Sequence, residues 1–402
     1  MTKPVRSLLA GPLLVGGGMG ILGLGSYVFL VVAGRSLSLA QFGRLSVLWS
    51  LLFGLVGGLA FPFEQETVRS IAASGRTRDV GRIAALAVGA VVVGEGAALW
   101  WGTARSGLSG DTSLLLATAV GIVGMPLAGL VRGMLVGAGR FLGAGAELAT
   151  EGLFRGLVVL VLAGAGAGVG TYGLLLAGAP LLAALVVAPT ALGSPHELGQ
   201  PRPWQILIRE VGTLLLGSGL ALVVLNLGPL LATRSDGAEG AARLTAVFTL
   251  VRLPVFFSGP VAATLLPRFV TAVTEGDLLP VLAGLARRLG GLLLVGGFAL
   301  GMIAPTAVRL LYGPKFVTSI ALSLLLATSG LIHLVAMVLQ AALVAGNARG
   351  AVVLGWAGGL VVLLVGTGLW VDASLLNVGW LYCLSSMATL MIMLTRVRSL
   401  KS

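Results

Sequence analysis

The chain has 402 residues, of which 57% are hydrophobic and only 10% are charged. Soluble globular proteins carry roughly 25% charged residues, so this composition excludes a soluble protein and predicts an integral membrane protein. The single cysteine, Cys383, excludes an internal disulfide framework and a cysteine-based zinc site. None of the three lysines follows a glycine, which excludes a Walker A loop and therefore an ATPase of the P-loop type.

Twelve apolar stretches are long enough to cross a membrane as helices. The first is no cleavable signal peptide, because it is long and glycine-rich and eleven more spans follow it. The sequence therefore predicts an all-α polytopic membrane protein with about twelve transmembrane helices. In chain order the spans are 11–33, 41–63, 83–101, 113–131, 146–167, 172–191, 211–232, 242–266, 289–308, 317–340, 350–371 and 375–394.

Glycines in the first span match a dinucleotide-binding pattern, Gly18-x-Gly20-x-x-Gly23. We regard the match as false, because it lies inside an apolar span with no strand before it. Gly16, Gly20, Gly23 and Gly25 instead indicate close helix packing or a bendable helix, unless they only reflect a glycine-rich composition.

The basic residues explain the formal net charge of +12. If the N-terminus is inside, most of the 26 lysines and arginines fall on the inner side, and Arg155 and Arg252 fall within spans. The positive-inside rule then predicts that both termini are cytoplasmic. Because the charge faces anionic lipid headgroups, we expect membrane lipids as partners and no nucleic acid.

Two segments of the chain resemble each other at one constant offset. Ala33–Leu51 and Ala232–Leu250 share an Ala, Arg, Ser, Arg, Leu, Leu pattern and join equivalent spans. A looser similarity links Leu135–Arg140 with Leu343–Arg349. The alternative is chance similarity in a chain rich in alanine, glycine and leucine. We interpret the matches as a parallel internal repeat, because six spans per half start both halves on the same side.

The repeat predicts two six-helix lobes, 1–195 and 211–402, joined by a cytoplasmic linker at 196–210 that contains Pro201 and Pro203 and directly follows Pro195. Two such lobes favour alternating access, with substrate bound between them. We expect a functional monomer, because such a cavity lies within one chain.

Charged residues within spans are costly in lipid, so each is a candidate functional residue. Glu147, Glu151 and Arg155 in span 146–167 stand at i, i+4 and i+8 and therefore share one helix face. That face is expected to point to a cavity or to another helix. The alternative is a local Glu151–Arg155 pair that neutralises itself.

Arg252 lies near the middle of span 242–266, just before Pro254. Because arginine binds phosphate bidentately, it is our first candidate for a substrate phosphate contact. Pairing with Glu151 or Glu95 is the competing interpretation. Glu95 in span 83–101 and Asn226 in span 211–232 either line the cavity or bond neighbouring helices.

Two further groups are gate candidates. Glu64, Glu66 and Arg69 end the second span, where they form either an inner gate or an interfacial cluster. Arg35 and Arg234 are equivalent in the repeat and lie outside, where an outer gate competes with helix capping and headgroup contacts. We find no paired carboxylates, metal cluster or nucleophile triad, so the sequence predicts no enzyme, no metal and no cofactor.

Three segments resemble bacterial oligosaccharide and polysaccharide flippases of the MATE-like superfamily, which includes the lipid II flippases. Arg35–Gly43 is similar to the family's "L-S-x-x-x-F-G" turn, and Leu311–Phe316 is similar to an "l-x-G-x-x-[FY]" element. Leu253–Pro254 and Leu265–Pro267 in span 242–266 complete the resemblance.

The resemblance implies two six-helix bundles around a partly cationic cavity in the inner (cytoplasmic) membrane. It implies translocation of an undecaprenyl-diphosphate-linked oligosaccharide for cell-surface polysaccharide synthesis, with polysaccharide polymerase and glycosyltransferases as further partners. Coupling to an ion gradient, coupling to the membrane potential and downhill removal of product all remain open as driving forces.

Two other functions compete with this interpretation. A drug/cation antiporter of the same fold commonly holds a carboxylate in the first helix, and span 11–33 contains no acidic residue. A membrane glycan polymerase or ligase usually carries a large outer loop with catalytic residues, and the outer loops predicted here are short.

Overall fold

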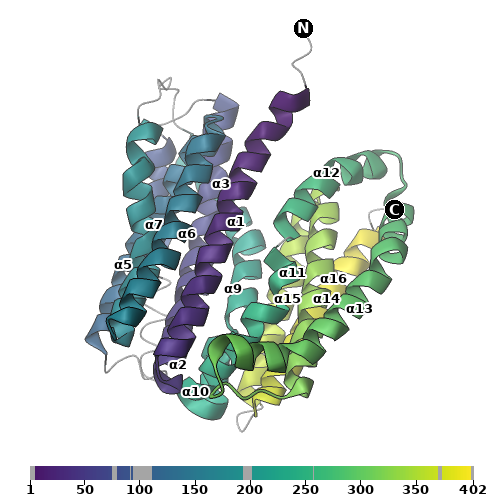
Figure 1. Ribbon diagram of the computed structural model, residues 1–402. Coiled ribbons are helices and arrows are strands. Elements are labelled where there is room, and N and C mark those ends of the chain that lie inside the picture. Colours follow the sequence, from purple (N-terminus) through teal and green to yellow (C-terminus); the bar gives the residue numbers. More distant parts are fainter. Residues whose placement is uncertain are drawn as a thin grey trace. The chain divides into compact units, whose positions relative to one another are not determined.

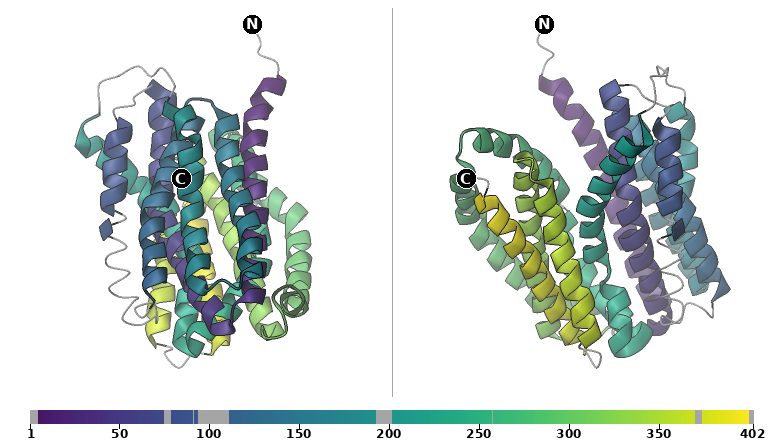
Figure 2. Two further views of the ribbon diagram at one scale, coloured as in Figure 1. Left: turned by 60° about the vertical axis from the view of Figure 1, so that its left-hand side comes forward. Right: turned by 180° about the vertical axis from the view of Figure 1, so that it is seen from behind.

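The computed structural model describes residues 5–74, 79–90, 92–93, 111–192, 202–256, 258–369 and 374–399. Within these ranges the chain is helical, with turns and no strand (Figure 1). The prediction of an all-helical fold is thereby confirmed for the described residues. The chain divides into two compact units, Met1–Asn226 and Leu227–Ser402. In Figure 2 the first unit is coloured purple to teal and the second green to yellow.

The first unit contains seven of the predicted spans or parts of them. Residues 79–90 are also helical. The labelled helices are α1 (Val5–Ser36), α2 (Leu39–Ser50), the π-helix η1 (Leu51–Val56), α3 (Gly57–Ser74), α5 (Thr112–Gly137), α6 (Phe141–Gly164), α7 (Val169–Leu192), α8 (Trp204–Leu214), the π-helix η3 (Leu215–Gly219) and α9 (Leu220–Asn226).

The second unit begins with a helix that breaks in its middle. Asp236 and Gly237 leave helical geometry inside α10, with φ of −125° and 58°. The helices are α10 (Gly228–Val251), α11 (Leu253–Phe256), α12 (Ser258–Thr274), α13 (Leu278–Tyr312), α14 (Ile320–Ala345), α15 (Arg349–Leu369) and α16 (Leu375–Ser399).

Among the described residues, nine helical stretches are long and apolar enough to cross a membrane. The longest, Trp204–Val251, has 48 residues, whereas one crossing needs about 20. α6 is outside this set although it has 24 residues, because it carries Glu147, Glu151 and Arg155. Positions 91, 94–101, 257 and 370–371 of the predicted spans lie outside the described residues, and most of the remaining positions fall on helices. Their exact number and the cytoplasmic termini remain predictions.

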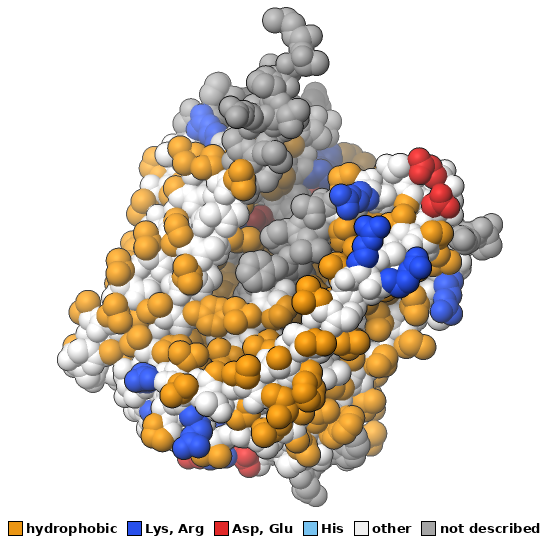
Figure 3. All heavy atoms as spheres, turned by 45° about the vertical axis from the view of Figure 1, so that its right-hand side comes forward, with side chains coloured by type: hydrophobic (Ala, Val, Ile, Leu, Met, Phe, Trp, Pro, Cys, Tyr) orange, Lys and Arg blue, Asp and Glu red, His pale blue; other side chains and the backbone are white. Residues whose placement is uncertain are grey.

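Large apolar side chains cover much of the exposed surface. On α13, Leu292, Val295 and Phe298 are 72%, 70% and 62% exposed. Figure 3 shows apolar side chains spread over one face, with basic side chains in groups toward its upper right and lower left. The exposed arginines of the second unit include Arg268 on α12 and Arg287 on α13. An apolar belt with charges toward the end is the surface that a bilayer requires.

Glycines allow α1 and α6 to pack backbone against backbone. A Cβ atom added at Gly18 would lie 2.3 Å from the carbonyl oxygen of Gly145, and one at Gly25 would lie 1.9 Å from that of Gly152. Close packing is therefore confirmed for Gly25. It is wrong for the other three glycines that the sequence indicated, Gly16, Gly20 and Gly23, which have nothing within 4 Å of such an atom.

The looser sequence repeat has the same backbone in both copies. Past the end of α5, Gly139 has φ of 72°, and past the end of α14, Asn347 has φ of 55°. In each copy the N–H of the next residue donates to a carbonyl of the last helical turn at 2.8 Å. This is the helix ending that favours glycine and then asparagine at the left-handed position.

The clearer repeat places a helix break at equivalent positions. α1 ends at Ser36 and α10 breaks just after Ser235, and both hydroxyls donate to a carbonyl of the preceding turn, at 2.9 and 3.0 Å. Ser38 then caps α2, in a capping box with Gln41. The flippase-like turn at Arg35–Gly43 is thus a helix-to-helix corner.

Candidate functional site

Helix α6 carries three buried charges on the face predicted from the sequence. The exposed fractions of Glu147, Glu151 and Arg155 are 0%, 5% and 0%. Side chains of three other helices meet this face. We call the set the α6 cluster, which consists of Ser26 on α1, Glu64 on α3, Arg132 on α5, and Glu147, Glu151 and Arg155 on α6.

Arg155 forms the self-neutralising pair that was the alternative interpretation from the sequence. Its Nη2 is ion-paired with Oε1 of Glu151, one turn away. Its Nη1 donates to the Ser26 hydroxyl at 2.7 Å, and the guanidinium lies 5.5 Å from the ring centroid of Phe53. Because α1 packs closely on α6 through its glycines, the Ser26 hydroxyl lies within hydrogen-bond distance of Arg155.

Arg132 is the centre of the cluster, and sequence reasoning missed it. Its Nε and Nη2 donate to the two carboxylate oxygens of Glu64 at 2.9 and 2.8 Å, and its Nη1 donates to Oε2 of Glu147 at 2.9 Å. From the sequence, Arg132 is one more basic residue at the inner end of a span. No spacing in the chain points to Glu64 as its partner.

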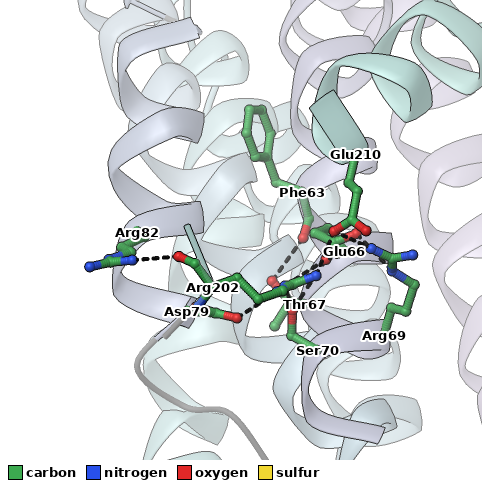
Figure 4. Close-up of polar contacts among 9 residues, drawn as sticks. All are labelled: Phe63, Glu66, Thr67, Arg69, Ser70, Asp79, Arg82, Arg202 and Glu210. Carbon is green, nitrogen blue, oxygen red and sulfur yellow. Dashed lines mark hydrogen bonds and ion pairs between the residues drawn. The ribbon is translucent and has the colours of Figure 1, made fainter. Parts of the chain in front are cut away.

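A second, partly buried network, the Arg202 network, consists of Glu66, Arg69, Ser70, Asp79, Arg202 and Glu210 (Figure 4). Arg202 lies between acids from three segments, as Figure 4 shows. Its nitrogens approach Asp79 at 2.7 Å, Glu66 at 2.8 Å and Glu210 at 2.6 Å. Burial alone lowers the pKa of Arg202, but the hydrogen bonds to Asp79 and Glu66 outweigh it, so the pKa is raised.

The gate candidates at the end of the second span divide between the two networks. Glu64 belongs to the α6 cluster, while Glu66 and Arg69 belong to the Arg202 network. Arg202 and Glu210, which lie in the predicted linker, are bound to α3 through the second network. These contacts are within the first unit, to which Trp204–Asn226 also belongs.

In the second unit the main candidate residue, Arg252, packs against aromatic rings. Arg252, 8% exposed, follows the last residue of α10, and its guanidinium lies 3.7 Å from the ring centroid of Phe248 and 4.9 Å from that of Tyr382. The neighbouring His333 packs on Trp356 at 4.8 Å. We call these five residues the Arg252 cluster. Cation–π contact stabilises a guanidinium away from water.

The remaining candidates have more ordinary surroundings. Asn226 donates to backbone carbonyls of Leu222 at 3.0 Å and Phe53 at 3.4 Å, which ties α9 to η1. Arg234 is exposed and donates to the carbonyl of Thr367 at 3.0 Å. Arg35 is exposed in the last turn of α1. Glu95 lies outside the described residues.

The chain resembles several solved structures of membrane transporters. A MATE family multidrug resistance transporter of the MOP superfamily, in an inward-facing conformation, matches with a TM-score of 0.63 and 13% identity over 94% of this chain and 95% of its own. The lipid II flippase MurJ, in an inward closed conformation, matches with a TM-score of 0.62 and 11% identity over 96% and 87%. The chain has the fold of MATE transporters.

The same fold occurs in a MOP superfamily transporter of Pyrococcus furiosus, with a TM-score of 0.60 and 13% identity over 100% of this chain and 97% of that one. Together with the nine apolar helical stretches found in the described part, these matches establish a multi-pass membrane protein.

Two uncharacterized proteins of Mycobacterium tuberculosis strain H37Rv are similar in sequence. One is 28% identical over 374 residues, covering 88% of this chain and 84% of the relative. The other is 28% identical over 347 residues, covering 82% and 78%. No family model matches the chain.

Proposed function

We propose that the protein is a flippase of the cytoplasmic membrane that moves a lipid-diphosphate-linked oligosaccharide for cell-surface polysaccharide synthesis, by alternating access. The observation that carries the proposal is the burial of Arg252 between Phe248 and Tyr382, in a fold that the lipid II flippase shares. Ionisable side chains inside membrane-spanning helices are costly, so each is a candidate for a functional site.

The aromatic packing suits a phosphate ligand. Aromatic rings stabilise a guanidinium group away from water, and phosphate oxygens bind to its N–H groups. Phe248 and Tyr382 therefore hold the guanidinium group of Arg252 in a buried position. His333 and Trp356, in the same cluster, pack on each other at 4.8 Å between ring centroids.

Arg252→Ala tests the assignment. In proteoliposomes that contain only this protein and a fluorescent undecaprenyl-diphosphate glycan, accessibility of the glycan to an external enzyme reports leaflet transfer. We expect wild-type transfer, and loss of at least about tenfold in the variant, since a charge-assisted hydrogen bond contributes about 1.5–3 kcal/mol. Arg309→Ala, an exposed change on α13, is the matched control. Normal transfer by folded Arg252→Ala protein would remove Arg252 from the site.

The second candidate function is a drug/cation antiporter. It is favoured by the buried carboxylates of the α6 cluster and by the match to a multidrug transporter. Against it, α1 carries no acidic residue, and the solved Pyrococcus furiosus transporter is described as having a binding pocket of reverse polarity that suggests a different function. Gradient-driven efflux of cationic dyes, with no leaflet transfer of any glycan tried, would favour the antiporter.

We infer a transporter and not an enzyme. We further propose that it works as a monomer in the inner membrane, beside the glycosyltransferases that make the glycan and the polymerase that consumes it. Light scattering of the purified protein in detergent, with the detergent mass subtracted, tests the monomer.

A further inference from the structure

The α6 cluster holds unequal numbers of acids and bases. Its charged members are the carboxyl groups of Glu64, Glu147 and Glu151 and the guanidinium groups of Arg132 and Arg155. With all of them ionised, three negative charges face two positive charges. An uncompensated charge in a buried site costs several kcal/mol, so the dry cluster is most stable with one carboxyl protonated.

The geometry selects Glu147 for that proton. Glu64 receives two hydrogen bonds from Arg132, and Glu151 is ion-paired with Arg155. Glu147 receives a single bond, from Arg132 to Oε2, while its Oε1 is buried and has no hydrogen-bond partner among the described residues. A buried carboxylate oxygen without a donor is a position where the ionised form is poorly solvated, and protonation removes that cost.

The surroundings fit a proton better than a metal ion. No group of three acidic, histidine or cysteine side chains in the described ranges converges as metal ligands do. The charged groups that face Glu147 are Arg132 on α5, Glu64 on α3 and Glu151 on its own helix. Arg132 and Glu64 are 19% and 15% exposed, whereas Glu147 is fully buried. The edge formed by Arg132 and Glu64 is therefore where water and a proton reach the cluster.

We propose that Glu147 binds a proton in the conformation seen here and releases it to water when the cluster opens, which couples leaflet transfer to the proton gradient. This coupling rests on the proposed flippase function, whereas the proton site does not. By linkage, proton uptake then favours the closed cluster, in which α6 packs against α5 and α3, and release favours the opened cluster, in which the Glu147 carboxylate is hydrated.

Infrared spectroscopy of the purified full-length protein tests the site without transport. A protonated carboxyl has its own C=O stretching band, and we expect one at neutral pH that disappears as the pH rises. Glu147→Gln should remove it, and Glu239→Gln, an exposed change on α10, should leave it. Absence of the band from wild-type protein, or its persistence in folded Glu147→Gln protein, would overturn the proposal.

Proteoliposomes with a pH gradient test the coupling. If one proton moves per cycle, one pH unit should change the steady-state leaflet ratio of the glycan about tenfold. In Glu147→Gln protein the ratio should not respond to the gradient. A wild-type ratio that ignores the gradient would refute coupling. If neither protein transfers any glycan, the flippase function has failed, and the infrared band alone decides the proton site.

Discussion

The two units hold buried charge in different ways. In the first, the guanidinium groups of Arg132 and Arg155 are matched to carboxylates on the same or neighbouring helices. In the second, Arg252 is flanked by Phe248 and Tyr382, whose rings carry no formal charge. Removing one member of such a buried pair leaves the other as an uncompensated charge, which destabilises the fold. The cation packed on aromatic rings suits the anion binding that we propose for the second unit, and the paired carboxylates suit the proton binding that we propose for the first.

The largest effect on stability is expected at Arg155. Arg155→Met leaves Glu151 as a buried charge without its partner, and breaking a buried pair in this way costs about 3–5 kcal/mol. The double variant Glu151→Gln/Arg155→Met should recover most of that loss. Unfolding in mixed micelles measures both. If Arg155→Met protein is as stable as wild type, the Glu151–Arg155 pair does not stabilise the fold as a matched buried pair should.

Close packing of α1 on α6 should matter next. Gly25→Ala places a methyl group against the carbonyl of Gly152, and overpacking of this kind costs about 1–3 kcal/mol. Gly23→Ala is the control two residues away, where the new atom meets nothing within 4 Å, and it should be neutral or slightly stabilising. Equal thermal stability of the two variants would contradict the close approach that brings Ser26 to Arg155.

The rings around Arg252 predict a smaller effect. Phe248→Leu removes the closer cation–π contact, which contributes about 2 kcal/mol when desolvated. Phe298→Leu, an exposed change on α13, should alter stability by less than about 0.5 kcal/mol. The midpoint of unfolding in mixed micelles distinguishes them. If Phe248→Leu behaves like Phe298→Leu, the rings do not hold the guanidinium group.

The smallest effect concerns a charge at a helix end outside the spans. Asp111 caps α5 by accepting from the N–H groups of Ser113 and Leu114, and Asp111→Ala should cost about 1 kcal/mol. Hydrogen bonding by Ser113 lowers the pKa of Asp111. A lowered pKa stabilises the fold above the unfolded value of about 3.9, and the gain is lost as the pH falls through the folded value. Asp111→Asn should keep the cap and lose this pH dependence.

Much of the helical layout follows from the sequence, because apolar length and period are local properties. The burial of Glu147, Glu151 and Arg155 on one face follows in the same way from their spacing. The looser repeat has matching helix endings, with Gly139 and Asn347 both in the left-handed region just past a helix.

The pairing of charges does not follow from the sequence. Arg132 pairs with Glu64 on another helix. Arg202 pairs with Glu66 on α3, Glu210 on α8 and Asp79. Which acid meets which base depends on how far each helix is rotated about its axis, and no spacing within one segment fixes that rotation. For the same reason the sequence grouped Glu64 with Glu66, although the fold sends them to separate networks.

The π-helix η1 has a consequence for how such a protein changes over time. It lies between α2 and α3 in one continuous rod, and a π-helical turn is an α-helix with one residue inserted. Because the widened turn takes up the extra residue, the helix after it keeps its rotation, and loss of one residue from Leu51–Val56 would restore the α-helix with Glu64 and Glu66 still facing their arginines. The same loss between Gly57 and Phe63 in α3 would instead rotate both acids by about 100°. The π-helix is therefore a position in this helix where a one-residue deletion preserves both ion networks.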